Sequence, residues 1–188
     1  MASEFSLIAW HFTRPTPNAV LGPGDDCALL APSPGMELAV TTDMLVAGTH
    51  FLPDADPEAL GWKTVAVNLS DLAAMGAQPR WLLLAGALPE ADGDWLAAFS
   101  RGLFDCADAF GAELVGGDTT RGPLCLSLTA IGELPSGAAL RRDGAQVGDE
   151  LWVSGSPGLA ALGLRHLLDG LTLPETVLAP AMSALHRP

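Results

Sequence analysis

Four short segments place aspartates beside glycines or hydroxyl side chains, where a strand or helix is expected to meet a loop. They are Gly22–Asp26, Thr41–Asp43, Asn68–Asp71 and Gly116–Arg121. Each segment alone is typical of an ordinary turn, because Gly-Asp pairs are common there. Together they supply oxygen donors only, and such hard ligands suit Mg²⁺ far better than Zn²⁺. The combination predicts a magnesium site, and magnesium in turn indicates a phosphate ligand.

Two glycines and two arginines complete the expected phosphate site. Gly116 and Gly117 would let backbone amides approach a phosphate closely, because glycine has no side chain. Arg121 and Arg142 lie in or beside polar, glycine-containing loops, where a guanidinium can make paired hydrogen bonds to phosphate oxygens. The alternative for each arginine is a surface salt bridge.

An apolar helix predicted to run to about Gly76 carries a polar stripe. Thr64, Asn68 and Asp71 lie at positions i, i+4 and i+7, so they share one face. The neighbouring residues are apolar around nearly the whole circumference, which predicts a largely buried helix. A buried carboxylate costs on the order of several kcal/mol unless it is paired or bound to metal. The stripe favours metal binding by Asp71; the alternative is that arginine or backbone donors satisfy it.

His50 follows Asp43 by seven residues, and its imidazole could orient a substrate or exchange a proton. An isolated histidine is more often structural, and no Ser-His-Asp arrangement can be assembled. The patterns Gly-x-x-x-x-Gly-Lys-Ser/Thr and Gly-x-Gly-x-x-Gly are both absent. Any nucleotide site is therefore of another kind.

Composition excludes several classes of function. The 188 residues include nine basic and 22 acidic ones, with a net charge of −13 and a single lysine, so we expect no nucleic-acid partner. The longest strongly apolar stretch, Trp81–Leu88, is far shorter than the ~20 residues that span a bilayer, and the N-terminus lacks a signal-peptide pattern. We expect no membrane contact and a cytoplasmic location.

The three cysteines, Cys27, Cys106 and Cys125, have no Cys-x-x-Cys spacing, and we expect them to be small buried residues.

Short apolar runs alternate with helical patterns and end at glycine or proline, which predicts a mixed α/β protein of the α+β class, with a mixed β-sheet. The expected strands are Cys27–Ala31, Glu37–Thr42, Arg80–Leu88, Glu113–Val115, Leu124–Glu133 and Glu150–Ser154. Helices are expected from Asp56 to about Gly76, from Asp94 to Gly111, and from Gly158 to about Gly170.

The polar, turn-rich segment Arg141–Asp149 predicts a domain boundary. We expect an N-terminal domain, which carries the four acidic segments, over residues 1–137 and a linker over 138–149. Residues 150–188 are expected to be the incomplete start of a second α/β domain, because they are too few for a core of their own.

The sheet itself suggests an oligomer. Trp81–Ala85 is apolar on both alternating faces, whereas the first domain offers only two substantial helices, which cover one face. A second copy packed sheet against sheet about a two-fold axis would cover the other face, so we expect a homodimer. The alternative is that the second domain or a loop covers it.

Taken in order, these motifs strongly resemble the thiamine-monophosphate kinase family, which belongs to the aminoimidazole-ribonucleotide-synthetase-like ATP-binding superfamily. The resemblance spans essentially the whole chain. The residues that carry it are Gly24-Asp25-Asp26, Thr41-Thr42-Asp43, His50-Phe51, Gly61-Trp62-Lys63, the segment from Asn68 to Gly76, Gly116-Gly117-Asp118-Thr119-Thr120-Arg121 and Arg142.

The resemblance implies ATP-dependent phosphorylation of thiamine monophosphate to thiamine diphosphate, by direct transfer of the γ-phosphoryl group without a covalent enzyme intermediate. It implies that Mg²⁺ is held by Asp26, Thr41, Thr42, Asp43, Asp71 and Asp118. It also implies that Gly117, Asp118 and Arg142 contact ATP and that His50 contacts the thiamine substrate; Asp25, Asn68 and Arg121 are further candidates. The family's N-terminal domains pair their sheets across a dimer, in agreement with the uncovered face.

Two motifs of that family are absent from these residues, an Asp-x-Ser-Asp-Gly-Leu-like segment with further metal ligands and a Gly-Gly-Glu-Asp segment near the substrate. Their absence raises an alternative, a catalytically silent MgATP-binding and dimerisation module. Within the enzyme class, the alternative is another ATP-dependent synthetase of the superfamily, for selenophosphate or aminoimidazole ribonucleotide.

Overall fold

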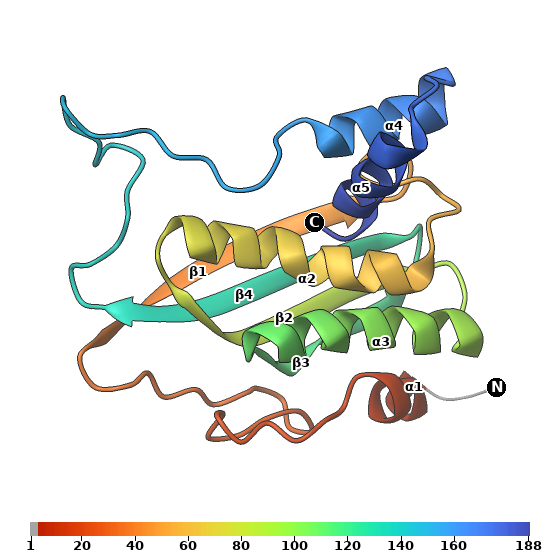
Figure 1. Ribbon diagram of the computed structural model, residues 1–188. Coiled ribbons are helices and arrows are strands. Elements are labelled where there is room, and N and C mark those ends of the chain that lie inside the picture. Colours follow the sequence, from red (N-terminus) through yellow and green to blue (C-terminus); the bar gives the residue numbers. More distant parts are fainter. Residues whose placement is uncertain (1–3) are drawn as a thin grey trace. The chain divides into compact units, whose positions relative to one another are not determined.

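Four strands form one mixed sheet in the order β1-β4-β2-β3 (Figure 1). The strands are β1 (Met36–Val46), β2 (Gln78–Leu88), β3 (Glu113–Arg121) and β4 (Cys125–Pro135). β4 pairs antiparallel with both β1 and β2, and β2 pairs parallel with β3. The expected α+β class with a mixed sheet is confirmed.

The computed structural model describes residues 4–188, which divide into two compact units, one ending at Leu140 and the other Arg141–Pro188. The first unit holds the sheet and the helices α1 (Glu4–His11), α2 (Pro57–Ala74) and α3 (Gly93–Phe110). The second unit holds α4 (Leu159–Asp169) and α5 (Glu175–His186). Within the described residues, no helix is both long and apolar enough to cross a membrane.

The ends of α2 and α3 follow local chemistry. The Asp56 carboxylate accepts a hydrogen bond from the Ala59 backbone N–H at 2.8 Å, and Pro57 fits the first turn. Asp92 caps α3 in the same way, and Gly111 ends it in the left-handed conformation, with φ of 70°. The predicted start of the first helix and end of the second are confirmed.

Glycines bring α2 and α3 into direct backbone contact. A Cβ atom at Gly61 would lie 2.0 Å from the carbonyl oxygen of Phe99, and one at Gly102 would lie 1.8 Å from that of Glu58. Only glycine fits at such a crossing. The two helices therefore form one layer over one face of the sheet (Figure 1), with the hydrophobic core between this layer and the sheet.

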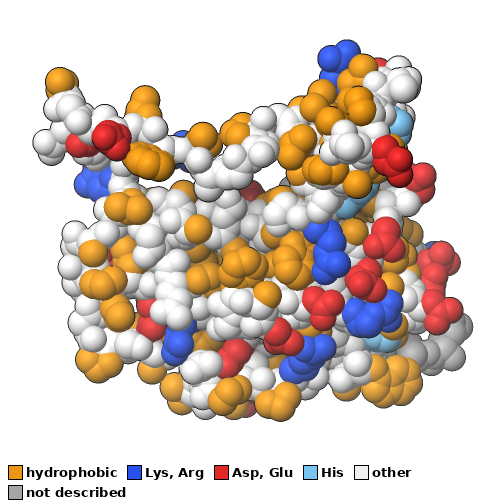
Figure 2. All heavy atoms as spheres, viewed as in Figure 1, with side chains coloured by type: hydrophobic (Ala, Val, Ile, Leu, Met, Phe, Trp, Pro, Cys, Tyr) orange, Lys and Arg blue, Asp and Glu red, His pale blue; other side chains and the backbone are white. Residues whose placement is uncertain are grey.

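Charged residues occupy the outer side of this helical layer. Figure 2 shows acidic and basic side chains intermixed there, and the Arg101–Glu58 ion pair of 3.1 Å joins α3 to α2. Asp105 and Asp108 are also exposed. This side is the solvated face that the helical periodicity of α3 predicts.

The opposite face of the sheet is only partly covered. Trp81 is fully buried, and its indole N–H donates a hydrogen bond to the carbonyl oxygen of Asn18 at 3.2 Å, so the segment before β1 covers this end. Towards the β1 edge, the side chains of Met36, Leu38, Val40 and Met44 are exposed. A loop therefore accounts for the burial of Trp81, and β1 keeps an exposed apolar row.

Two predicted strands are wrong. Cys27–Ala31 has only an isolated bridge between Leu21 and Leu29, and Glu150–Ser154 has no strand, with Trp152 and its neighbours exposed. A short apolar run becomes a strand only where a partner strand lies beside it, and neither run has one in its own unit. Helices α1 and α5 are additional elements.

In the second unit, α4 and α5 pack on one another. A Cβ atom at Gly163 of α4 would lie 2.7 Å from the carbonyl oxygen of Ala181, so glycine again permits close helix contact. The predicted helix from Gly158 to about Gly170 is confirmed by α4.

Candidate functional site

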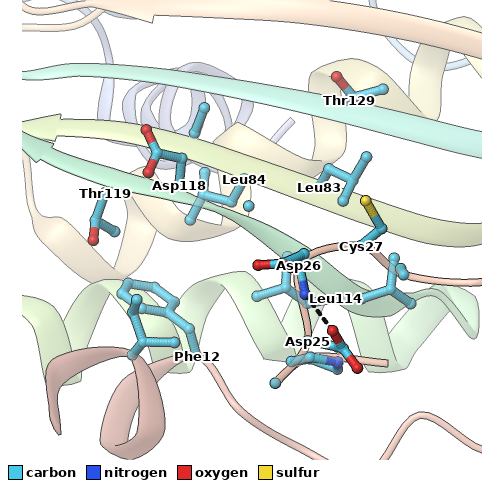
Figure 3. Close-up of a pocket in the computed structure, with 18 of the residues that line it drawn as sticks. Phe12, Asp25, Asp26, Cys27, Leu83, Leu84, Leu114, Asp118, Thr119 and Thr129 are labelled. Carbon is cyan, nitrogen blue, oxygen red and sulfur yellow. Dashed lines mark hydrogen bonds between the residues drawn. The ribbon is translucent and has the colours of Figure 1, made fainter. Parts of the chain in front are cut away.

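A pocket of about 850 Å³ opens on the partly covered face of the sheet. Its walls are parts of β2, β3 and β4, the loop of residues 23–28, and α1 (Figure 3). Apolar side chains form one part of the lining and include Phe5, Ile8, Phe12, Leu114 and Val115. The pocket thus combines an apolar wall with a polar, acidic rim.

The acidic rim consists of Asp25, Asp26 and Asp118, all exposed (Figure 3). The Asp26 backbone N–H donates a hydrogen bond to Oδ1 of Asp25 at 2.8 Å, so Asp25 helps to shape its own loop. Within the described residues, the carboxylates of Asp26 and Asp118 make no hydrogen bond or ion pair. These two carboxylates are available to a ligand.

Gly117 and Asp118 lie in β3 rather than in the expected loop. Leu82 pairs with Leu114 but Leu83 pairs with Gly116, so Val115 is an extra residue and the strand bulges there. Gly117 has φ of 152°, and a Cβ atom on it would lie 1.8 Å from the carbonyl oxygen of Leu84. Only glycine suits this position, and the bulge directs the following aspartate toward the pocket.

The pocket loop is anchored on both sides. The carboxylate of Glu113 accepts hydrogen bonds from the backbone N–H of Asn18, at 3.1 Å, and from its side-chain amide. Beyond the loop, the buried carboxylate of Glu133 accepts from the backbone N–H of Ser33 at 2.6 Å and from its hydroxyl at 3.0 Å. The Glu133 carboxylate also lies 3.4 Å from the guanidinium of Arg80. The sequence analysis missed both glutamates, because the role of each depends on a residue about a hundred positions away.

A second polar cluster lies where β1 meets α2. The Thr41 hydroxyl donates a hydrogen bond to Oδ2 of Asp71 at 2.8 Å. The amide oxygen of Asn68 accepts from the backbone N–H of Asp43 at 3.0 Å, and its amide nitrogen donates to the Thr64 carbonyl at 3.1 Å. Thr64 and Asn68 are buried as expected, but Asp71 is exposed, which corrects its predicted burial. Leu72, the next residue, is buried, so Asp71 lies on the solvent side of the same helical turn.

The remaining predicted residues are His50, Arg121, Arg142 and Thr42. His50 is exposed in the loop after β1, and Arg121 is exposed at the end of β3. Arg142 is exposed in the second unit. Thr42 faces away from α2, and its hydroxyl lies 2.7 Å from that of Thr129. Thr129 lines the pocket, and the alternation of side chains along β4 could have indicated this position.

The predicted ligands are thus divided between two edges of the sheet. Asp43 lies on β1 and Asp118 on β3, and the two strands are three spacings apart, about 14 Å. Among residues 4–188, no three histidine, cysteine or acidic side chains lie close enough to hold a metal ion together.

Two further residues with chemically active side chains are Lys63 and Cys27. Burial lowers the pKa of the Lys63 ammonium, whose nitrogen lies 3.5 Å from the carbonyl oxygen of His50. Cys27 is exposed and lines the pocket, which corrects its predicted burial, whereas Cys106 is fully buried and Cys125 is half-buried. The signal for Lys63 was that it is the only lysine in the sequence.

Residues 24–134 match the family described as AIR synthase related protein, N-terminal domain. The chain belongs to this family. The AIR synthase related region begins at Gly24 in the pocket loop and ends at Leu134 in β4. It therefore contains the pocket rim and the polar cluster between β1 and α2.

This AIR synthase related chain is similar to thiamine-monophosphate kinases. The enzyme of that name from Salmonella typhimurium (strain LT2) is 53% identical over 175 residues, which are 92% of this chain and 54% of the relative. The crystal structure of the enzyme from Stenotrophomonas maltophilia K279a has a TM-score of 0.84 at 50% identity, and the match covers 92% of this chain and 56% of that chain.

A further similar structure is described as AaThiL complexed with AMPPCP and TMP. It has a TM-score of 0.76 at 33% identity, and the match covers 84% of this chain and 51% of that chain. The resemblance that the motifs indicated is confirmed. The chain spans about half the length of the curated relatives it matches.

Proposed function

We propose that this AIR synthase related chain takes part in the ATP-dependent phosphorylation of thiamine monophosphate to thiamine diphosphate. The observation that carries the proposal is the pocket, where the available carboxylates of Asp26 and Asp118 lie with Gly117 after the β3 bulge, in a chain 53% identical to a thiamine-monophosphate kinase. The structure described with AMPPCP, an ATP analogue, and TMP supports the same two ligands here.

The donor set fits Mg²⁺. Asp26 and Asp118 would hold it at the pocket, with the Thr42 hydroxyl as a further oxygen donor on that side of the sheet. Asp43 and Asp71 would hold it between β1 and α2, with the Thr41 hydroxyl as a further donor. Bound Mg²⁺ would neutralise phosphate charge that a chain of net charge −13 otherwise repels.

The chain's own contribution is positioning. Gly117 has no side chain, so its backbone N–H can approach a phosphate oxygen closely. Asp25 holds the loop that carries Asp26, and Asn68 holds the strand that carries Asp43. Arg142 is proposed as a further ATP ligand, as the resemblance implies. Fixed groups of this kind lower a phosphoryl-transfer barrier without a covalent intermediate.

A homodimer is part of the proposal. The exposed row of Met36, Leu38, Val40 and Met44 continues an apolar sheet face, and a second copy packed on it would remove that surface from water. With a two-fold axis parallel to the strands, β1 of one copy would lie opposite β3 of the other. Such packing would bring the two separated acidic edges closer together than they lie in one chain.

The test is to incubate the protein with ATP, thiamine monophosphate and Mg²⁺, and to measure thiamine diphosphate formation and ATP binding by calorimetry. Mg²⁺-dependent product supports the kinase. A different result is Mg²⁺-dependent ATP binding without product, under conditions in which a full-length relative forms thiamine diphosphate. It would mean that the chain is the catalytically silent MgATP-binding module. Product from another acceptor of the superfamily assigns a different synthetase, and the absence of ATP binding contradicts the pocket as a nucleotide site.

A matched pair of variants locates the site. Asp118→Asn removes a carboxylate from the pocket rim, whereas Asp105→Asn removes one from the solvated face of α3. Loss of Mg²⁺-dependent ATP binding in the first variant alone supports the pocket.

A further inference from the structure

Two threonine hydroxyls meet on the pocket side of the sheet. Thr42 of β1 and Thr129 of β4 are partners in the strand register, and their hydroxyl oxygens lie 2.7 Å apart. Thr129 lines the pocket (Figure 3) and is half-buried, whereas Thr42 is exposed. The hydroxyl pair therefore connects the edge strand β1 to the pocket.

The pair has one more proton than it uses. Each hydroxyl has one proton to donate and lone pairs that can accept. One of the two protons lies between the two oxygens, so the other is left for a different acceptor. Within residues 4–188, neither Thr42 nor Thr129 makes a second side-chain hydrogen bond. One hydroxyl proton is therefore available to a ligand.

The Mg²⁺ contact proposed for Thr42 gives the pair a direction. A bound cation draws electron density from a hydroxyl oxygen, which makes that hydroxyl a stronger donor and a weaker acceptor. Thr42 would then donate to the oxygen of Thr129, and the proton of Thr129 would be the available one. Because Thr129 lines the pocket, its proton can be donated to a ligand there.

The sheet leaves space for a ligand between Thr129 and the acidic rim. β4 and β3, which carry Thr129 and Asp118, are two strand spacings apart, about 10 Å. On β2 between them, Ala85 pairs with Asp118, is exposed, and lines the pocket. Its small side chain keeps this part of the pocket floor low. A chain of linked phosphates suits such a separation better than a single phosphate does.

We propose that Thr129 is a further binding residue, whose hydroxyl accepts a hydrogen bond from Thr42 and donates one to a phosphate oxygen of the nucleotide. This inference rests on the proposed function for the nucleotide and for the Mg²⁺ contact of Thr42. The alternative is that the two threonines only join their strands, since cross-strand threonine pairs stabilise sheets by themselves. A strand-joining pair affects the stability of the free chain, whereas a binding residue affects ligand affinity.

Three variants of the 188-residue chain separate the hydroxyl from the rest of the side chain. Thr129→Val keeps the shape and loses the hydroxyl, and Thr129→Ser keeps the hydroxyl. Thr172→Val makes the same chemical change at an exposed position of the second unit, outside the pocket lining. We expect ATP with Mg²⁺ to bind on the order of tenfold more weakly to Thr129→Val, as measured by calorimetry. The other two variants should bind it with close to the parent affinity.

Two results of this titration would overturn the proposal. The first is an equal affinity of Thr129→Val and the parent for ATP, and urea unfolding of the free variant would then measure the strand-joining role that remains. The second is a loss of affinity in Thr129→Ser as large as that in Thr129→Val, because the hydroxyl would then not be the group that binds.

Tripolyphosphate with Mg²⁺ identifies the acceptor as a phosphate oxygen. We expect Thr129→Val to weaken tripolyphosphate and ATP by similar factors. A loss for ATP alone overturns the phosphate contact. If the parent binds tripolyphosphate but not ATP, the nucleotide of the proposed function is contradicted, and a loss in Thr129→Val still supports the contact of Thr129 with phosphate. If the parent binds neither, both proposals are overturned.

The double variant Thr42→Val/Thr129→Val tests the direction of the pair. If Thr42 orients the Thr129 hydroxyl, the loss of ATP affinity in the double variant should be smaller than the product of the two single losses. Losses that multiply would mean that the two hydroxyls act independently, and would overturn the directed pair.

Discussion

The Thr41 hydroxyl donates a hydrogen bond to Oδ2 of Asp71 across 2.8 Å, which joins the edge strand β1 to helix α2. The next residue, Thr42, faces the other side of the sheet, and its hydroxyl lies 2.7 Å from that of Thr129. The two adjacent threonines therefore face opposite sides of the sheet, because side chains alternate along a strand.

This alternation gives a matched pair of substitutions. Thr41→Val removes the donor that fixes Asp71, and we expect Mg²⁺-dependent ATP binding to weaken by on the order of tenfold, since hydrogen bonds to charged groups are the stronger ones. Calorimetric titration at fixed Mg²⁺ measures the change, with Asp71→Asn as the stronger perturbation of the same contact. Ser70→Ala, at an exposed position beside Asp71, is the control. Equal affinity of the parent and Thr41→Val would remove any role for the contact.

Gly117 gives a prediction about stability. Gly117→Ala places a Cβ atom 1.8 Å from the Leu84 carbonyl oxygen at a φ of 152°, and we expect it to lower the free energy of unfolding by about 2–4 kcal/mol. Gly116→Ala is the control, since its Cβ atom would meet only the flexible side chain of Leu83, at 3.2 Å. Urea unfolding of both variants measures the difference, and an equal loss in the two would show that the bulge does not demand glycine.

Asn68 is the buried link between β1 and α2. Asn68→Leu keeps the volume but leaves the backbone N–H of Asp43 without its acceptor, so we expect a loss of about 1–3 kcal/mol in unfolding free energy. Ser70→Ala on the same helix is exposed and should change stability by less than about 0.5 kcal/mol. The denaturant concentrations at the unfolding midpoints measure this loss. Similar midpoints for the two variants would mean that the Asn68–Asp43 hydrogen bond does not stabilise the protein.

Local chemistry predicted much of this fold. Asp56 followed by Pro57 correctly predicted where α2 begins, and Gly111 correctly predicted where α3 ends, because caps depend on adjacent residues. The bulge before Gly117 could not be predicted in this way. It is a register shift relative to β2, and no pattern within β3 alone contains the register of its partner.

The sequence did not predict how deeply each side chain of α2 is buried. The stripe of Thr64, Asn68 and Asp71 correctly predicted one polar face, but periodicity does not tell how far a helix sinks into its neighbours, so Asp71 was predicted buried and is exposed. The division of the acidic residues between β1 and β3 follows from strand order, which is decided by long-range pairing. The candidate residues were predicted as one set, and the structure divides them between two edges of the sheet.

Lys63 predicts a pH dependence of stability. Burial lowers its pKa in the folded protein below the unfolded value of 10.5, so the unfolded chain binds the proton more tightly. The resulting destabilisation is fully present below the folded pKa and disappears as pH rises toward 10.5. We expect Lys63→Met to gain stability relative to the parent at pH 7, and this gain to shrink at higher pH. Urea unfolding of both proteins from pH 7 to 11 measures it, and a constant difference would contradict the burial effect.

Val40 tests the proposed homodimer. Its side chain is 62% exposed in the middle of the apolar row on β1, so a carboxylate there would have to be buried without a partner if two sheets packed face to face. We expect Val40→Glu to shift the protein from dimer to monomer in sedimentation velocity at micromolar concentration, with its secondary structure retained. Ala109→Glu adds the same charge at an exposed position of α3, on the opposite side of the sheet, and should leave the dimer intact. A monomeric parent, or dissociation by both variants alike, would mean that this face does not bind a second copy.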